Sequence, residues 1–216
     1  MTRWRTWRVT IALVALGTVP VVAGALRLVE LSGGTQAIPS DARYHATPLP
    51  VVLHITCAAA FAVVGAFQFA PRLRRHSWHR RAGRVLVVAG LGVALSALWL
   101  NQYVPREGAT REVLYPLRLA FGVAMVVTLV LGLRAARRRD TTRHRAWMIR
   151  SYAIGLVAGT QVFTLGIGGA LLGTGDLTTA LLLAAAWGIN LAVAEGAIRS
   201  RPRRRTPAPA MRAAVP

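Results

Sequence analysis

The sequence predicts an all-α integral membrane bundle of six transmembrane helices with both termini in the cytoplasm. Hydrophobic residues make up 54% of the 216 residues. Six apolar runs are long enough to cross a bilayer, which takes roughly 20 residues of helix. The basic residues are all arginine, and most of them gather on alternate connectors between these runs. Together the two patterns favour a membrane protein over a soluble one.

The apolar runs use most of the chain and leave no connector long enough for a separate catalytic domain. We expect one membrane domain over residues 1–198 and a basic, disordered cytoplasmic tail over 199–216, because the tail is rich in arginine, proline and alanine. The predicted spans are, in order, about 9–29, 50–70, 84–104, 114–134, 148–172 and 177–198.

Local signals mark several of these spans. The first run follows a basic head as a signal peptide would, but it is longer than the usual signal core, so a retained helix is expected. Pro48 and Pro50 suit the first turn of the second span. Aromatic residues place the outer ends of the third and fourth spans at the membrane interface. The fifth span carries Gly155 and Gly159, whose spacing lets helices approach closely and predicts a place at the bundle centre.

The arginines assign the orientation. Of the 27 arginines, 22 lie at the N-terminus, around the second-to-third and fourth-to-fifth connectors, and in the tail, together with only two acids. The other five arginines balance five acids on the opposite side, so the whole formal charge of +20 lies on one side. Such loops stay cytoplasmic, and the orientation requires an even number of spans. The positive charge thereby follows from the membrane topology, and nucleic-acid binding is not expected.

Polar residues inside apolar spans are costly in hydrocarbon, so each is a candidate functional residue. His54 and Gln68 fall close to one face of the second span, and Asn190 and Glu195 occupy the inner half of the sixth. Two structural interpretations stay open beside the functional one. Glu195 can pair with Arg199 one turn later on the same helix, and His54 can bond a neighbouring carbonyl at the interface.

A pair of histidines suggests a cofactor. His79 and His144 each open a helix on the cytoplasmic side and are expected at similar depth. Two imidazoles from different helices are the axial ligands that a b-type haem takes, and nearby arginines would neutralise its propionates. The alternative is that both histidines bind lipid phosphate together with the arginines.

Three segments have a recognisable pattern: residues 71–84, residues 144–153 and residues 190–195. The most specific is the string His-Arg-Ala-Trp-Met-Ile-Arg that begins at His144. These segments resemble the signatures of the DUF2306 family of predicted bacterial membrane proteins, over roughly residues 50–198. The resemblance implies a shared helical bundle and no particular reaction. In that family an arginine is often found in the middle of the span after this string, whereas residues 159–163 of this chain contain none.

Three functional hypotheses follow. The first is a cytoplasm-facing polar pocket that binds an anionic small molecule or a lipid headgroup, with His54 and Gln68 on a separate helix face. The pocket residues would be His79, Arg84, His144, Arg150, Asn190 and Glu195. The second is an electron-transfer protein with one haem between His79 and His144. The third is a small-molecule transporter, which needs a broken helix or a polar cavity near the midplane.

The same features predict a location and partners. We expect a multi-pass protein of the bacterial inner (plasma) membrane, with the lipid bilayer and anionic headgroups at the cytoplasmic face as partners. The sequence shows no motif of a soluble enzyme, and oxidoreductase activity is expected only with haem bound. The oligomeric state stays open.

Overall fold

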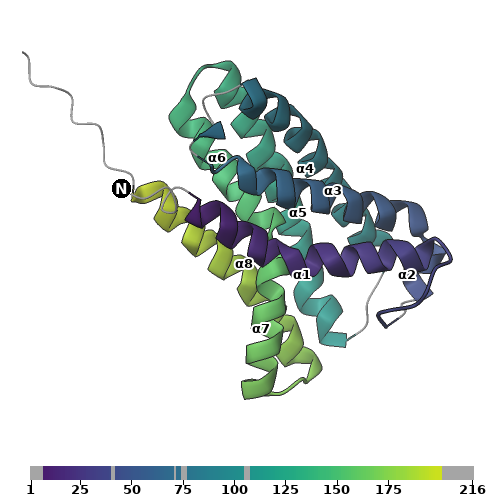
Figure 1. Ribbon diagram of the computed structural model, residues 1–216. Helices are drawn as coiled ribbons and strands as arrows, with labels where there is room; N and C mark the ends of the chain where they lie inside the picture. The colour runs from purple at the N-terminus through teal and green to yellow at the C-terminus, as the bar shows by residue number, and fades with distance from the viewer. Residues whose placement is uncertain (1–6, 40–41, 71, 74–76, 105–107, 201–216) are drawn as a thin grey trace, which may run out of the picture.

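The computed structural model describes residues 7–39, 42–70, 72–73, 77–104 and 108–200, and within them every regular element is a helix. The all-α prediction is therefore confirmed for this part of the chain. The predicted tail beyond residue 200 lies outside it. Figure 1 shows the elements in order. They are α1 (Arg8–Leu31), α2 (Ala42–Ala46), α3 (Pro48–Phe67), α4 (Ser77–Tyr103), α5 (Gly108–Arg137), α6 (Thr141–Gly155), α7 (Val157–Leu172) and α8 (Asp176–Arg199).

Five helices are long and apolar enough to cross a membrane: α1, α3, α4, α8 and most of α5. A sixth span exists if α6 and α7 count as one, since this pair passes the same test together but is bent by 46°. The predicted fifth span, 148–172, is therefore a broken helix and not a continuous one. The break lies at Leu156, whose φ of −87° and ψ of 6° leave the helical range.

The helix ends differ from the predicted spans mainly where arginine is abundant. The third span was expected from residue 84, but α4 already begins at Ser77, and the last turn of α5 extends to Arg137. Arginine is a good helix former and is hydrophilic, so the helices continue beyond the apolar stretch that hydropathy detects. The connector after α1 contains the short helix α2.

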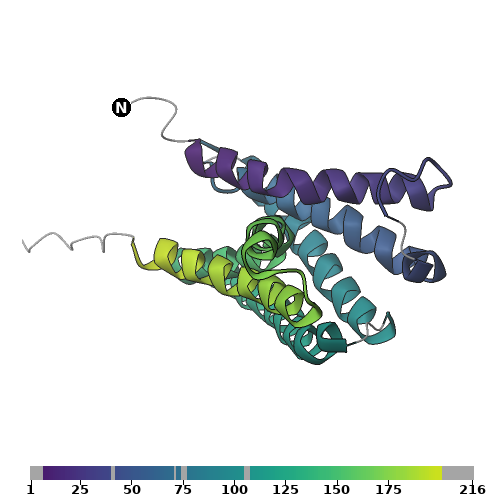
Figure 2. The same cartoon turned by 90° about the horizontal axis from the view of Figure 1, so that it is seen from below.

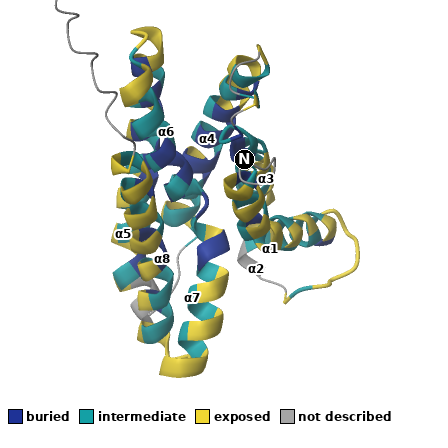
Figure 3. Ribbon diagram, turned by 60° about the vertical axis from the view of Figure 1, so that its left-hand side comes forward, coloured by how far each residue is buried: buried dark blue, intermediate teal, exposed yellow. Residues whose placement is uncertain are grey.

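The helices form two diverging groups, which Figures 2 and 3 show from below and from the side. On one side α1 packs on α3, and α3 packs on α4. On the other side α8 packs on α5, α6 and α7. The groups are joined because α5 also packs on α4, and α1 also reaches α7. The buried core lies between them and includes Phe61, Val93, Met125, Leu129, Tyr152 and Trp187.

Large apolar side chains cover the outside. Val88 is 71% exposed on α4, Leu171 is 77% exposed on α7, and Val193 is 68% exposed on α8. A folded protein in water rarely exposes so much contiguous apolar surface. In hydrocarbon the same surface is solvated by lipid, so the distribution is that of a membrane-embedded bundle.

Candidate functional site

A bidentate ion pair joins α6 to α8. Arg150 Nε donates to Glu195 Oε1 at 2.6 Å, and Arg150 Nη2 donates to Glu195 Oε2 at 3.1 Å. Both side chains are partly open, with 27% and 32% of their surface exposed. The guanidinium carbon of Arg150 lies 4.9 Å from the ring centre of Trp147, one turn earlier in α6. The bidentate partner of Glu195 is thus Arg150 on another helix, whereas the same-helix alternative named Arg199.

Asn190 precedes Glu195 in α8 by more than one helical turn. Its side chain bridges the break between α6 and α7 at Leu156. Its Nδ2 donates to the backbone oxygen of Ala153 at 2.9 Å, and its Oδ1 accepts from Thr160 Oγ1 at 2.6 Å. Ala153 belongs to α6 and Thr160 to α7, so one side chain holds both halves of the bent pair. A break in a membrane helix exposes backbone groups that need new partners, and Asn190 supplies one for the Ala153 carbonyl.

The polar side chains between α6, α7 and α8, among them Arg150, Thr160, Asn190 and Glu195, form what we call the polar seam. One further contact extends this seam, and a close approach of α1 borders it. In α7, Gln161 Nε2 donates to the backbone oxygen of Leu183 in α8 at 3.2 Å. On the α1 side, a Cβ added to Gly159 would lie 2.3 Å from the backbone oxygen of Leu16. Only glycine lets α1 come this close to α7, directly beyond the break. Of the two spaced glycines predicted for the fifth span, Gly159 therefore serves the contact with α1, whereas Gly155 lies against Phe61 of α3 and Met125 of α5.

His144 is oriented by α5. Its Nδ1 lies 2.8 Å from the backbone oxygen of Gly132. A carbonyl only accepts, so Nδ1 carries the proton in this contact and a neutral ring presents an unprotonated Nε2. The next residue, Arg145, reaches the end of α8, where its Nη2 donates to the backbone oxygen of Ala197 at 3.1 Å.

His79 and Arg84 lie on α4, away from the contact between α6 and α8. The backbone oxygen of His79 accepts from Gln68 Nε2 at 3.5 Å, which places Gln68 beside the start of α4. Arg84 is on the exposed face of α4. Of the six predicted pocket residues, the structure therefore brings together Arg150, Asn190 and Glu195. It places His79 and Arg84 on a different helix and ties His144 to α5.

His54 lies between α3 and α4, separate from that cluster. Its Nδ1 is 3.0 Å from Ser96 Oγ. The Ser96 hydroxyl itself donates to backbone oxygens one turn earlier in α4, including that of Val93 at 3.1 Å. Because the hydroxyl proton is used there, His54 donates to Ser96. The backbone carbonyl of Val93 is a second hydrogen-bond partner of His54, so the structural alternative, a bond to a neighbouring carbonyl, agrees with this contact.

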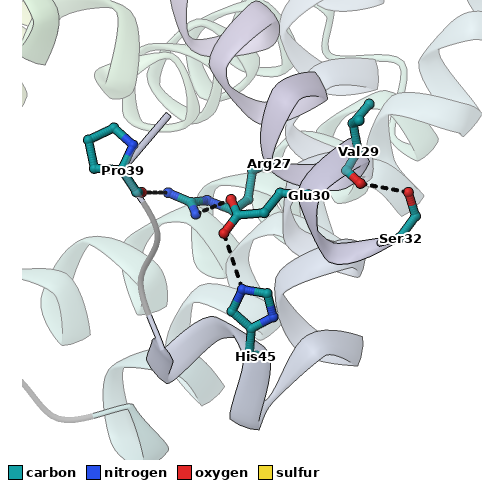
Figure 4. Close-up of polar contacts among 6 residues, drawn as sticks. All are labelled: Arg27, Val29, Glu30, Ser32, Pro39 and His45. Carbon is teal, nitrogen blue, oxygen red and sulfur yellow. Dashed lines mark hydrogen bonds and ion pairs between the residues drawn. The ribbon is translucent and has the colours of Figure 1, made fainter. Parts of the chain in front are cut away.

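A polar cluster that was not predicted from the sequence lies at the C-terminal end of α1, as Figure 4 shows. Glu30 is only 7% exposed and accepts from Arg27, one turn earlier. Arg27 Nη2 also donates to the backbone oxygen of Pro39 at 2.7 Å, and His45 Nε2 lies 3.1 Å from Glu30 Oε1. The spacing of three residues between Arg27 and Glu30 was the signal that could have revealed the pair. We call these four residues the outer latch, because they tie the connector to α1.

The described residues hold no group of three or more histidine, cysteine or acidic side chains that could bind a metal ion. A haem with two histidine ligands does not need such a group. For such a haem, the free Nε2 of His144 is the relevant atom, and the carbonyl contact of Nδ1 is the usual way to orient a ligating imidazole.

Comparisons with known proteins agree with the sequence segments. A family model described as "Predicted membrane protein (DUF2306)" matches residues 51–198. The match runs from α3 through nearly all of α8 and confirms the resemblance seen around His79, His144 and Glu195. Helix α1 and the outer latch lie before the matched residues. No curated protein and no solved structure matches the chain.

Proposed function

The chain belongs to the DUF2306 family of predicted membrane proteins, and we propose that it crosses the membrane six times with both termini in the cytoplasm. In this topology α6 and α7 together form the fifth span. The count is supported by the arginines, because an odd number of spans would place the basic C-terminal end on the outside. Residues 1–198 then form one membrane domain, followed by a basic cytoplasmic tail over 199–216.

The proposed location is the inner (plasma) membrane of a bacterium. In this orientation the arginines of the α5–α6 connector and of the end of α8 face the cytoplasmic leaflet. Anionic lipid headgroups are attracted to such basic segments, each arginine near the surface contributing about 1 kcal/mol. Anionic headgroups are therefore the expected lipid partners at this face.

We further propose that the protein is a carrier for a small molecule or lipid headgroup that bears an anionic group. One observation carries this proposal: the fifth span is broken at Leu156, and Asn190 bridges the break. Broken helices that meet polar side chains within the membrane are the usual construction of transporter binding sites. The Arg150–Glu195 pair supplies an anion-binding group on the cytoplasmic side of the break.

The two halves of the broken span differ in how firmly they are held. Helix α6 is tied to α3 through Tyr152 Oη, which donates to the backbone oxygen of Ala62 at 2.7 Å, and to α5 through His144. Helix α7 packs mainly on α8 and α1, and Phe163 and Ile167 on its outer face are more than half exposed. A movement about Leu156 that shifts α7 against a fixed α6 would open and close the polar seam.

The proposal is tested by uptake into proteoliposomes. Vesicles containing the purified protein are incubated with an extract of phosphate- and carboxylate-bearing metabolites, and their contents are measured by mass spectrometry. A parallel assay follows the transfer of an acyl-labelled fluorescent lipid, phosphatidylglycerol or phosphatidylethanolamine, between leaflets by dithionite bleaching. We expect at least one substrate to be transported, and Asn190→Ala to slow its transport about tenfold or more, since the bridge across the break is lost.

The matched control is Thr56→Ala. Among the residues that the structure describes, the Thr56 hydroxyl bonds only the backbone oxygen of Val52 in its own helix, at 2.8 Å and on an exposed surface, so its loss should leave transport unchanged. If vesicles with the wild-type protein neither accumulate a solute nor transfer the lipid faster than empty vesicles, the carrier proposal is wrong.

The haem hypothesis has one observation in its favour, the orientation of His144 by Gly132. An absorption spectrum distinguishes the haem hypothesis from the carrier proposal. Membranes from cells supplied with haem should show a reduced-minus-oxidised haem band that disappears in His144→Ala if the protein transfers electrons. A colourless preparation would end this alternative and leave the carrier proposal untouched.

A further inference from the structure

The ion pair between α6 and α8 retains unused bonding capacity on both partners. Arg150 offers five N–H donors, and its described contacts use only Nε and Nη2. Glu195 has about four lone-pair positions on its two oxygens and uses two of them for Arg150. Since about a third of each side chain is exposed, a ligand can reach both without separating them.

The pair also has a fixed geometry. Trp147 stacks near the guanidinium of Arg150 at 4.9 Å, and the bidentate contact fixes the rotation of that group about its axis. The free edge of Arg150 and the free lone pairs of Glu195 therefore lie side by side. A preorganised cation next to a preorganised anion matches a ligand that carries both signs in the reverse order.

The surroundings favour a phosphate as the negative group of that ligand. Arg145 binds the backbone oxygen of Ala197, two residues after Glu195, and Arg199 follows Glu195 by one turn. With Arg150 and Glu195 these side chains carry a net charge of two positive units, which suits a phosphate better than a carboxylate. Glu195 lies four residues before the end of α8, or roughly 6 Å of helix rise, which is a depth that a lipid headgroup reaches.

We infer that the ligand of this site is a phosphate zwitterion of the ethanolamine type, with its phosphate on Arg150 and its primary ammonium on Glu195. The four charges then alternate around a closed square, and each contact is a charge-assisted hydrogen bond. A primary ammonium is preferred over a quaternary one, because only the former donates N–H bonds to the Glu195 carboxylate. This inference rests on the proposed carrier function and names its substrate class.

Two sources supply this chemistry, free phosphoethanolamine and the headgroup of phosphatidylethanolamine. For the free compound, binding to the delipidated, detergent-purified protein is measured by calorimetry. Ethyl phosphate, which lacks the amine, and ethanolamine, which lacks the phosphate, are the matched ligands. We expect phosphoethanolamine to bind about tenfold or more tightly than either, and phosphocholine to bind no more tightly than ethyl phosphate. This comparison uses the wild-type protein and so does not depend on the folding of a variant.

For the lipid, native mass spectrometry counts the molecules retained from an equimolar mixture of phosphatidylethanolamine and phosphatidylcholine. Preferential retention of the ethanolamine lipid, lost in Glu195→Gln, identifies the headgroup as the ligand. Glu195→Gln keeps the shape of the side chain but removes its charge, so ethyl phosphate should still bind to the variant. The inference is overturned if neither assay distinguishes the primary ammonium from its matched controls. In that case, uptake of a different solute into proteoliposomes would still support the carrier proposal. If the zwitterion binds but no solute or lipid is transported, the carrier proposal is wrong and the ligand assignment stands.

Discussion

At the scale of single residues, Tyr152 is the anchor of α6. Its hydroxyl bonds the backbone of α3, and its ring lies 5.6 Å from Phe61 and 5.2 Å from Phe69, centre to centre. The ring packs against Gly65, where an added Cβ would lie 2.3 Å from Cε2 of Tyr152. The glycine is thus required by a close approach, and the tyrosine has no room to retreat because only 6% of it is exposed.

Replacing Gly65 by alanine should therefore destabilise the protein. We expect Gly65→Ala to lower the free energy of unfolding by about 1–3 kcal/mol, the usual effect of overpacking a tight core. Thermal unfolding of the purified protein in detergent measures the change. The control is Gly83→Ala in α4, where an added Cβ meets nothing within 4 Å. That substitution should be neutral or stabilising by up to about 1 kcal/mol. Equal effects at the two positions would contradict the packing argument.

The residues of the site were predictable in kind and not in pairing. The hydropathy pattern identifies Asn190 and Glu195 as candidates because each interrupts an apolar run. In the structure, both residues lie in the polar seam. Their partners Arg150 and Thr160 are 45 and 30 residues away in the sequence, and the pairing depends on how α6 and α7 rotate against α8. One sequence carries no signal for that rotation. The same limit applies to His79 and His144, which the sequence places at similar depth and which lie on α4 and α6.

At the scale of elements, the outer latch fixes the connector after α1. Glu30→Gln removes the charge that holds Arg27 and His45 while keeping the size of a side chain that is almost buried. We expect limited proteolysis between Ser32 and Thr47 to become about fivefold faster or more, since a loss of roughly 1 kcal/mol raises the open population by that factor.

The control for the latch is Ser32→Ala. Within the described part of the chain, the Ser32 hydroxyl bonds only the backbone oxygen of Val29, at 2.8 Å and on an exposed surface (Figure 4). Its removal leaves the contacts between connector and helix in place, so the cleavage rate should stay near that of the wild type. A Glu30→Gln protein that resists the protease as well as Ser32→Ala would show that other contacts hold the connector.

The break at Leu156 could not be predicted from the sequence of the span that contains it. The stretch before it and the stretch after it are both apolar, so a hydropathy window covers 148–172 as one span. Gly155 and Gly159 flank the break and were noticed for their spacing, but such glycines also occur in straight helices that pack closely. What decides between the two is the partner Asn190 on α8, which satisfies the backbone of the bent form.

At the scale of the whole molecule, the path of the bent pair α6–α7 through the membrane decides on which side the arginines after α8 lie. If α6 and α7 cross the membrane together, the α5–α6 and α7–α8 connectors lie on opposite sides. If the pair turns back as a re-entrant loop, both connectors lie on the same side, the chain has five spans, and the arginines after α8 face outward. The arginine count distinguishes these arrangements only statistically, whereas a label at each connector separates them directly.

We expect the two connectors to be on opposite sides. In a Cys57→Ala background, Thr142→Cys reports the start of α6 and Thr174→Cys reports the α7–α8 connector; both positions are exposed. A membrane-impermeant maleimide applied to bacterial spheroplasts should label the cysteine at 174, and should label the one at 142 only after lysis. The order follows because Thr142 lies among seven arginines and Thr174 lies beside none. Labelling of both positions, or of neither, before lysis would favour the re-entrant loop, and a carrier hinged within a full span would no longer be tenable.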